Sequence, residues 1–301
     1  HILSDMMLCY LNGSLTDKDQ TNIRIENRGF TFADGLFEVI RIIDGVPLFL
    51  ESHYKRMQES AIFFRIPFSY NLQECYRQSL ELIEKNDLTD GELYWELTRG
   101  DDTFREHGFR EEHQGTFAIL TIPLRHINPE NWGKGVSLTL YPDLRHQLCE
   151  HKTINLLANC MAKNFAYSQG SYDSMMFRQE KDGRKYITEG GSSTYFLVKD
   201  GVIATPEIDN ILPGITRKKV ISICKDLQIP LIQRRVYVNE IKHAQEIFLA
   251  STVSKVMPVK KIGNIVYPVD GKITRTLMNA FAQLIEVQID EFNQISNNKG
   301  M

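Results

Sequence analysis

The chain has little of what marks secreted, membrane or metal-binding proteins. Its five cysteines are odd in number and widely spaced, with no CxxC pair and no His/Cys cluster, so we expect neither a disulfide framework nor a zinc site. No apolar run approaches the roughly 18 residues that a membrane span requires, and the first residues lack the charged and apolar regions of a signal peptide. The sequence therefore predicts a cytoplasmic protein without a membrane partner.

A strong excess of one charge and a dinucleotide fingerprint are also missing. The 35 basic and 38 acidic residues leave a net charge of −3, and no basic patch interleaves with aromatic residues, so nucleic acid is not an expected partner. No Gly-rich fingerprint follows a predicted strand, which argues against a Rossmann enzyme. What remains is a chain of 301 residues, long enough for about two domains.

The order of predicted elements indicates an α/β (α+β) chain in two parts. Asp44-Gly45 between two apolar runs predicts a hairpin. Pro129 and two glycines mark the best candidate for a boundary. Helices are expected at about 50–64 and 72–86, and strands at about 92–98, 116–122 and 136–140. The expected parts are a small N-terminal α/β domain (1–123), an interdomain connector (124–135), a larger C-terminal domain (136–292) and a disordered polar tail (293–301).

One further helix is expected directly after Lys152. Leu157, Met161 and Phe165 recur at i, i+4 spacing, which predicts a stripe that faces the core. Because Cys160 lies beside this stripe, we expect a buried structural thiol there.

A lysine and a glutamate stand where a particular chemistry is expected. Lys152 precedes that helix, and Glu189 ends a predicted strand and opens a loop of small residues. A lysine can form a Schiff base with an aldehyde cofactor, and a carboxylate beside a pyridine nitrogen keeps that nitrogen protonated. Taken alone, the pair more often represents a surface lysine and a helix-capping glutamate. The pair therefore needs support from other parts of the chain.

Two segments are suited to hold a phosphate group. Leu212–Arg217 opens an amphipathic helix, whose N-terminus offers unpaired backbone N–H groups, and Leu249–Ser254 is the second segment. The hydroxyls of Thr216 and Thr252 would add donors. Arg56 would supply a fixed positive charge. For each segment by itself, an ordinary N-cap or a solvated arginine is the alternative.

Together these residues resemble the class IV aminotransferases, the fold type IV family of pyridoxal phosphate enzymes. The likeness covers nearly the whole chain, from about Tyr10 to about Val259. It implies a two-domain fold with pyridoxal 5'-phosphate between the domains, in which 136–292 is the cofactor-binding domain. The motifs that carry it are Arg28-Gly29-Phe30-Thr31-Phe32-Ala33-Asp34-Gly35-Leu36-Phe37-Glu38, His53-Tyr54-Lys55-Arg56-Met57, the Lys152 segment, Thr188-Glu189-Gly190, Pro213-Gly214-Ile215-Thr216-Arg217 and Ser251-Thr252.

The resemblance also implies a role for each residue of the cofactor site. Lys152 is then the catalytic Schiff-base lysine, Glu189 is the partner of the pyridine nitrogen, and Leu212 packs on the ring face. The implied phosphate ligands are Arg56, Ile215, Thr216 and Thr252. The implied site also includes Ser193, Thr194, Gly214 and Ser251. The family usually has Ser-Asn at the Ser193-Thr194 position and often Gly-Thr at the Ser251-Thr252 position, and both changes keep a hydroxyl donor.

A loop near residue 100 bears on the substrate. A predicted strand feeds a loop that ends Arg105-x-His107, and an arginine beside an imidazole is a good trap for a substrate α-carboxylate. A mobile polar loop is the alternative. The stretch is similar to the D-amino acid aminotransferase branch, in which such a loop serves the neighbouring subunit's site, so a homodimer is implied. That branch has a tyrosine at the substrate-binding position where this chain carries Phe37.

Two further arginines are candidates for the substrate carboxylate. With Asp182-Gly183 as a two-residue hairpin turn, Arg178 lies opposite Ile187 and on the sheet face of Glu189, about 7 Å along the strand. Arg28 precedes the loop that contains Phe37, and either arginine would replace the missing tyrosine. An ordinary exposed strand arginine is the alternative for Arg178.

Three interpretations of the substrate stay open. A D-amino acid aminotransferase using 2-oxo acids, with D-glutamate or D-alanine first, is favoured by Arg105-x-His107. An L-branched-chain aminotransferase is favoured by Arg41, because Phe37-Glu38-x-x-Arg41 resembles that branch, although its Tyr-x-Arg-Pro segment is absent at Tyr94-Trp95-Glu96. An aminodeoxychorismate lyase of the same fold has no specific support. Outside enzymes, a degenerate cofactor-binding protein is disfavoured by the presence of both Lys152 and Glu189.

Overall fold

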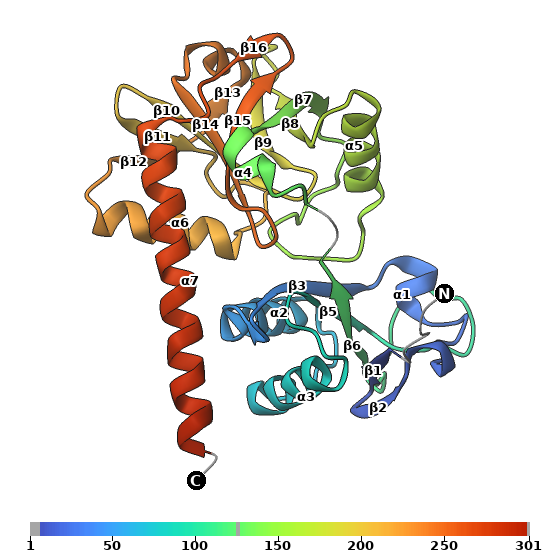
Figure 1. Cartoon of the computed structure of the whole chain (residues 1–301). Helices are drawn as coiled ribbons and strands as arrows, with labels where there is room; N and C mark the ends of the chain where they lie inside the picture. The colour runs from blue at the N-terminus through green and yellow to red at the C-terminus, as the bar shows by residue number, and fades with distance from the viewer. Residues whose placement is uncertain (1–6, 125–126, 300–301) are drawn as a thin grey trace. The chain divides into compact units, whose positions relative to one another are not determined.

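The computed structural model describes residues 7–124 and 127–299, which form two compact units, each with its own sheet (Figure 1). The first unit consists of residues 7–124, His151–Asn155 and the end of the chain from Gln288. The second consists of residues 127–150 and Leu156–Val287. This mixture of helices and sheets is the α/β (α+β) class expected from the sequence. Residues 125 and 126 of the expected connector lie outside the described residues.

The sheet of the first unit is antiparallel, with the strand order β2-β1-β6-β5-β3-β4. The predicted turn between β3 and β4 is confirmed: Asp44 and Gly45 have φ angles of 51° and 75°, and positive φ at both positions matches the right-handed twist of a tight hairpin. The strands are β1 (Leu8–Leu11), β2 (Ser14–Asp17), β3 (Gly35–Ile43), β4 (Val46–Pro47), β5 (Gly91–Thr98) and β6 (Thr116–Pro123).

Two helices cover one face of this sheet, α2 (Leu50–Phe64) and α3 (Leu72–Lys85), as Figure 1 shows. Ile40 and Trp95 are fully buried against them. Because side chains alternate along a strand, Phe37 and Glu96 point to the opposite face. The unit also contains the short helices η1 (Lys18–Gln20) and α1 (Arg28–Phe32).

The sheet of the second unit mixes parallel and antiparallel pairs in the order β12-β11-β10-β14-β15-β7-β8-β9-β13, with β16 on β15. Parallel pairing joins β15 to β7 and β7 to β8. The strands are β7 (Val136–Pro142), β8 (Asp173–Gln179), β9 (Lys185–Gly190), β10 (Thr194–Lys199), β11 (Val202–Thr205), β12 (Leu231–Gln233), β13 (Val236–Tyr237), β14 (Glu246–Ser251), β15 (Lys255–Ile262) and β16 (Ile265–Val266).

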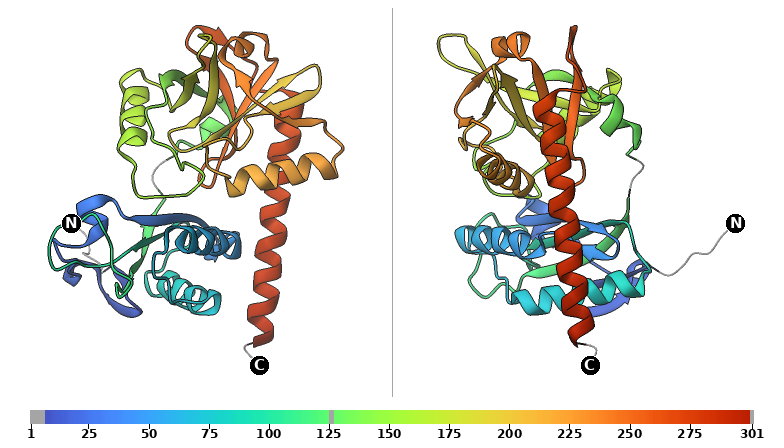
Figure 2. Two further views of the ribbon diagram at one scale, coloured as in Figure 1. Left: turned by 180° about the vertical axis from the view of Figure 1, so that it is seen from behind. Right: turned by 60° about the vertical axis from the view of Figure 1, so that its left-hand side comes forward.

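Helix α5 (Leu157–Ser168) lies against β7 and β8, but not with the predicted face (Figure 2). Ala162 and Ala166 are fully buried, whereas Leu157 is 74 % and Met161 48 % exposed. Cys160 is exposed, so the expectation of a buried thiol was wrong. The small alanine side chains let the helix approach the sheet closely, and this leaves the larger apolar side chains on the outside of this chain. The other helices of the unit are α4 (Glu130–Lys134), α6 (Ile215–Asp226) and η2 (Val238–His243).

The last helix, α7 (Lys272–Lys299), continues through most of the predicted polar tail. Its start is held by Glu246, whose carboxylate accepts hydrogen bonds from Ile273 N and Thr274 N at 3.2 and 2.8 Å. In its second half, the Gln288 side chain accepts a hydrogen bond from Phe49 N at 3.2 Å. Polar residues extend a helix that packing has already nucleated, so the expectation of disorder from 293 was wrong as far as 299.

No helix within residues 7–124 and 127–299 is long and apolar enough to cross a membrane.

Candidate functional site

Lys152 is held at the edge of the first unit's sheet by backbone hydrogen bonds. Phe37 N donates to Lys152 O at 3.0 Å, and Ile154 N donates to Gly35 O at 3.1 Å, so the segment pairs with β3 in antiparallel fashion. A Cβ atom on Gly35 would stand 2.9 Å from Ile154 Cδ1 and 2.7 Å from a backbone oxygen, which explains the glycine. The Lys152 Nζ lies 3.9 Å from the centroid of the Phe37 ring. The lysine is therefore placed through its backbone, and its side chain lies over an aromatic face.

His151 anchors the same segment to α2. Its ring stacks on Phe63 with centroids 4.3 Å apart and meets Phe64 edge-on at 4.8 Å. Its Nδ1 lies 3.0 Å from the Ser60 hydroxyl. These contacts restrict the chain immediately before Lys152.

Arg56 is part of a buried cluster that the sequence did not suggest. Its Nε and Nη2 donate to the two oxygens of Glu38, both at 2.7 Å, and His53 Nδ1 lies 2.6 Å from the same carboxylate. Burial by itself would raise the pKa of Glu38, but the charges of Arg56 and His53 outweigh it and lower the pKa to about 2. Burial lowers the pKa of His53. The carboxylate thus fixes the orientation of the arginine predicted to hold phosphate. The one sequence feature that could have indicated the cluster is the spacing of His53 and Arg56, which places both side chains on one face of the helix.

The buried Glu38 makes a prediction for acid stability. Its pKa is lower in the folded chain (about 2) than its ordinary value of 4.5, so its contribution is complete above pH 4.5 and is lost as the pH falls toward 2. At about 1.4 kcal/mol for each tenfold change in proton affinity, the contribution is about 3 kcal/mol. We expect Glu38→Gln to lower the free energy of unfolding at pH 7 by about that amount, and to flatten its decline between pH 4.5 and 2.

Denaturant unfolding at a series of pH values measures this effect. The matched control is Glu51→Gln, because that carboxylate is 62 % exposed in a surface pair, where solvent screens the interaction and its contribution to stability is small. A Glu38→Gln protein whose stability declines with acid as steeply as the wild type would contradict the assignment.

Glu189 lies at the end of β9 in a buried charged cluster of the second unit. Its Oε1 accepts hydrogen bonds from Leu212 N at 3.1 Å and from Arg145. Arg145 is itself held by both oxygens of Asp143, at 2.9 and 2.8 Å, and Arg178 Nη2 reaches Asp143 at 3.1 Å. Burial raises the pKa of Glu189, and the charge of Arg145 opposes that rise without cancelling it. The sequence analysis did not identify Arg145 and Asp143, because no motif connects them with Glu189, which lies more than 40 residues later in the chain.

The predicted strand register around Arg178 was wrong by one residue. Arg178 pairs with Tyr186, not with Ile187, because Glu180 N donates to Arg184 O at 2.8 Å and closes a three-residue loop. A one-residue difference exchanges the faces of a strand, and a bulge farther along β9 shifts the register again. Arg178 therefore reaches the Glu189 cluster through Asp143 rather than by the predicted strand alignment.

The turn after Glu189 is organised by a buried aspartate. Asp173 accepts hydrogen bonds from Gly191 N at 3.1 Å and from the Ser193 hydroxyl at 2.8 Å. A Cβ atom on Gly190 would stand 2.9 Å from Asp173 and 2.5 Å from Ser193 Oγ, so only glycine fits. Thr194 follows as the buried first residue of β10. The Ser193 hydroxyl thus supports the turn.

The first of the two predicted phosphate segments forms a helix N-terminus, as expected. Gly214 is the N-cap of α6, and no side chain caps this end of the helix. Ile215 and Thr216 are both buried. Backbone N–H groups of the first helical turn have no partner within a helix, so this end is suited to an anion.

The second phosphate segment is a hairpin connection, not a helix N-terminus. Ser251 ends β14 and pairs with Lys255 of β15. Its hydroxyl accepts a hydrogen bond from Ser254 N at 3.0 Å and closes the turn. Thr252 is half-buried within that turn.

Arg28 lies beneath the loop predicted to bind the substrate carboxylate. Its guanidinium donates to Asp34 and Asp102 at 2.8 and 2.6 Å, and to the carbonyl oxygen of His107 at 3.0 Å. The Arg105 guanidinium lies 4.9 Å from the centroid of the Phe32 ring, and its side chain is exposed, as is that of His107. Within this chain Arg28 shapes the loop, whereas Arg105 and His107 are presented to its outside.

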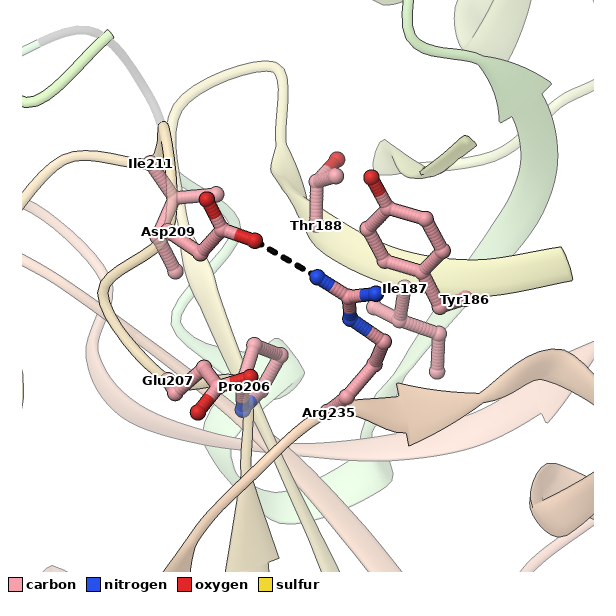
Figure 3. A pocket seen from close by; sticks show the side chains of 8 residues that line it. All are labelled: Tyr186, Ile187, Thr188, Pro206, Glu207, Asp209, Ile211 and Arg235. Atoms are coloured by element: carbon pink, nitrogen blue, oxygen red, sulfur yellow. Dashed lines mark hydrogen bonds and ion pairs between the residues drawn. The ribbon is translucent and has the colours of Figure 1, made fainter. Parts of the chain in front are cut away.

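A small pocket of the second unit lies beside the loop that carries Leu212 (Figure 3). Arg235 crosses it, donating to Asp209 at 2.6 Å and to Glu180 at 2.7 Å. Thr188 lines this pocket, and its buried hydroxyl has no hydrogen-bond partner among the described residues. Through Arg235, polar contacts in this pocket thus connect the loop with the β8–β9 connection. Its lining residues are Tyr186, Ile187, Thr188, Pro206, Glu207, Asp209, Ile211 and Arg235.

Each unit, taken by itself, contains groups of the kinds that parts of pyridoxal 5'-phosphate require. The first unit supplies a positioned lysine and a buried, rigidly held arginine, Lys152 and Arg56. The second supplies a buried carboxylate with a fixed orientation, Glu189, and the uncapped helix N-terminus at Gly214. An amine, a carboxylate and anion-binding groups are what the aldehyde, the ring nitrogen and the phosphate of this cofactor require.

Comparison with known proteins agrees with this chemistry. The chain matches the family model described as amino-transferase class IV over residues 35–262. It is 31 % identical over 285 residues to the D-alanine aminotransferase of Staphylococcus epidermidis, which covers 93 % of this chain and 99 % of that protein. It is 34 % identical over 257 residues to the D-alanine aminotransferase of Bacillus licheniformis, with 85 % and 88 % covered.

A solved structure shows the same fold. The branched-chain amino acid aminotransferase of Escherichia coli superposes with a TM-score of 0.84 at 24 % sequence identity, over 92 % of this chain and 94 % of that one. The family model covers well over half of the chain, and the motifs around Lys152 and Glu189 lie within it. The chain therefore belongs to the class IV aminotransferases, pyridoxal phosphate-dependent enzymes that transfer amino groups.

Proposed function

We propose that this aminotransferase transfers the amino group of D-amino acids, D-alanine and D-glutamate among them, to 2-oxo acids. The observation that carries the proposal is the loop ending at His107: Arg28 holds its backbone, and the Arg105 and His107 side chains are presented outward. An arginine fork with a neighbouring imidazole suits a carboxylate. The similarity to the two D-alanine aminotransferases supports the same reading.

The catalytic roles follow from the chemistry of the side chains. When bound, pyridoxal 5'-phosphate supplies an aldehyde and a ring that withdraws electrons from the substrate Cα. The Lys152 Nζ would hold the cofactor at its aldehyde carbon until the substrate amine takes that place, and the released amine would then serve as the base that takes a proton from the substrate Cα. Glu189, oriented by Arg145 and by Leu212 N, would hold a proton on the ring nitrogen.

The remaining cofactor residues serve the phosphate and the surroundings of the ring. The N-terminus of α6 would offer backbone N–H groups to the phosphate, and Arg56, which Glu38 orients, would add a positive charge. Leu212 would pack on the ring face. The other proposed cofactor residues are Ser193, Thr194, Gly214, Ile215, Thr216, Ser251 and Thr252, with Phe37 and Arg178 on the substrate side.

The branched-chain alternative loses its main sequence support. Arg41 donates to the carbonyl oxygens of Ile42 and Gly91 at 2.5 and 2.8 Å and pairs with Asp90. Its guanidinium therefore fastens the start of β5 to β3. This structural role accounts for the arginine without any contact to substrate.

A comparison of enantiomers tests the proposed function. We expect D-alanine to react with the cofactor-loaded enzyme faster than L-leucine or L-valine does. Arg105→Ala should slow the D-alanine reaction by roughly one to two orders of magnitude, because a charged hydrogen bond to a carboxylate is worth about 1.5–3 kcal/mol. Stopped-flow absorbance of the bound cofactor measures both rates.

The matched control for this substitution is Arg24→Ala. The Arg24 side chain is 65 % exposed in surface pairs with Glu26 and Asp101. Its removal should leave the D-alanine rate unchanged. A faster reaction with L-leucine than with any D-amino acid would replace this proposal by the branched-chain reading.

We further propose that the enzyme is a homodimer, with the Arg105 to His107 loop completing the partner's site. Several large apolar side chains of the first unit are exposed: Ile25 by 73 %, Phe30 by 76 % and Phe104 by 59 %. An interface between two copies of the chain would remove such apolar side chains from water. Light scattering at assay concentration checks the proposal, and a fully active monomer would remove its premise.

A further inference from the structure

A row of three residues crosses the first unit's sheet on the face opposite α2 and α3. Phe37 of β3 pairs directly with Glu96 of β5, and Lys152 stands opposite Phe37 on its other side. Side chains of directly opposed residues point to the same face. With about 4.8 Å between neighbouring strands, Glu96 lies about 10 Å from Lys152 across the sheet. The order is thus a lysine, an aromatic ring and a carboxylate.

Glu96 has no cationic partner among the described residues of this chain. Its Oε2 accepts a hydrogen bond from the Tyr94 hydroxyl at 2.9 Å, and it is half-buried. Burial and the charge of Glu96 both raise the pKa of Tyr94, so the tyrosine keeps its proton and remains a donor. This hydrogen bond orients the carboxylate but leaves its negative charge uncompensated.

Like the carboxylate of Glu96, the aromatic rings beside it favour a positively charged ligand. Phe37 and Tyr94 lie with their ring centroids 5.8 Å apart on this face. The ammonium group of Lys152 already lies 3.9 Å from the centre of the Phe37 ring. Aromatic faces attract cations, and a neighbouring carboxylate strengthens that attraction. The same surface repels a carboxylate of a ligand.

We propose that Phe37, Tyr94 and Glu96 form a cation-accepting subsite, which makes the enzyme prefer amino donors with a positively charged side chain over donors of similar length that carry a second carboxylate. The inference rests on the proposed function, because it takes Lys152 as the reacting lysine. It refines the expectation of D-glutamate as a first donor: D-ornithine should react faster. The negative charge of this subsite also disfavours binding of the substrate α-carboxylate on this face, so arginine side chains elsewhere bind that carboxylate.

Three donors of similar length and different charge test the subsite. They are D-ornithine, D-glutamine and D-glutamate, with positive, neutral and negative side chains. We expect kcat/KM to fall in that order for the wild type. Glu96→Gln keeps the shape and the Tyr94 hydrogen bond but removes the charge, so it should raise the D-glutamate to D-ornithine ratio about tenfold or more.

The matched control is Glu92→Gln. Glu92 lies on the same strand and the same face, four residues or about 13 Å away, and its substitution changes the net charge equally. The substrate ratio should stay at the wild-type value in this variant. An unchanged ratio in Glu96→Gln overturns the proposal. An equal loss of kcat/KM for all three donors, together with a change in molecular size, would also overturn the proposal, because it would assign Glu96 to contacts between subunits.

A binding measurement separates failure of the subsite from failure of the proposed function. Pentanoate and glutarate are unreactive, have the same chain length and differ by one carboxylate. Calorimetry on the cofactor-loaded enzyme should show glutarate binding about tenfold more weakly than pentanoate to the wild type, and equally to Glu96→Gln. If L-amino acids prove to be the donors, the proposed function fails, whereas this ratio still decides the subsite. Equal binding of pentanoate and glutarate to the wild type would overturn the proposed subsite.

Discussion

Lys152→Ala is expected to abolish transamination while leaving the fold intact. Acid–base catalysis by a positioned side chain contributes roughly 10²–10⁴-fold, and loss of the covalent link to the cofactor adds to the defect. The fold should survive because the backbone, not the side chain, pairs this segment with β3. Turnover of D-alanine, the visible absorption of the bound cofactor and circular dichroism measure the three quantities.

A surface lysine provides the control for this substitution. Lys55 is 62 % exposed in a pair with Glu51, so Lys55→Ala should keep both turnover and the absorption band. Near wild-type turnover by Lys152→Ala would show that another residue carries the proton.

Glu189→Gln is expected to slow the reaction by roughly one to two orders of magnitude, with a much smaller loss of cofactor affinity. A neutral amide cannot hold a proton on the ring nitrogen, and a charge-assisted hydrogen bond of this kind is worth about 1.5–3 kcal/mol. The proposed phosphate-binding groups, the N-terminus of α6 and Arg56, are unchanged in this variant. The fold should be kept, because Arg145 retains both of its hydrogen bonds to the Asp143 carboxylate.

Two measurements on the same variant decide the role of Glu189. The dissociation constant of the cofactor and the rate of the D-alanine half-reaction should change by different factors. Glu207→Gln, at an exposed glutamate near the same loop, is the control for the loss of one negative charge. Equal losses in affinity and rate would indicate that Glu189 is structural.

The Glu189 cluster shows where sequence reasoning stops. Glu189 was identified from the residues around it, but Arg145, which orients it, comes from a different segment and has no motif of its own. The position of Arg178 was derived from an assumed turn length, and one additional loop residue changed its partner from Ile187 to Tyr186. A register depends on the hydrogen bonds that close the loop, and these are not visible in composition.

Helix α5 shows the same limit for packing. The spacing of Leu157, Met161 and Phe165 describes an apolar stripe correctly, but periodicity does not state what the stripe faces. The structure places Ala162 and Ala166 against the sheet, because a close approach to β8 needs small side chains. The apolar stripe is then left for a surface outside this chain.

The sequence by itself determined the features that depend on neighbouring residues. These are the hairpin at Asp44-Gly45, the span of α2, the helix start at Ile215, and the pairing of a lysine with a strand-end glutamate as the chemical signature of the family. Backbone preference, periodicity and the chemistry of a short motif act over a few residues, so they can be read directly from the chain.

Only the tertiary structure decided which distant groups share a local environment. It brought Glu38 and His53 to Arg56, Arg145 to Glu189, and Glu96 into one row with Phe37 and Lys152. These contacts depend on sheet register and on the burial of charge, which result from the packing of the whole unit. They give the residues recognised by motif their orientation and their charge state.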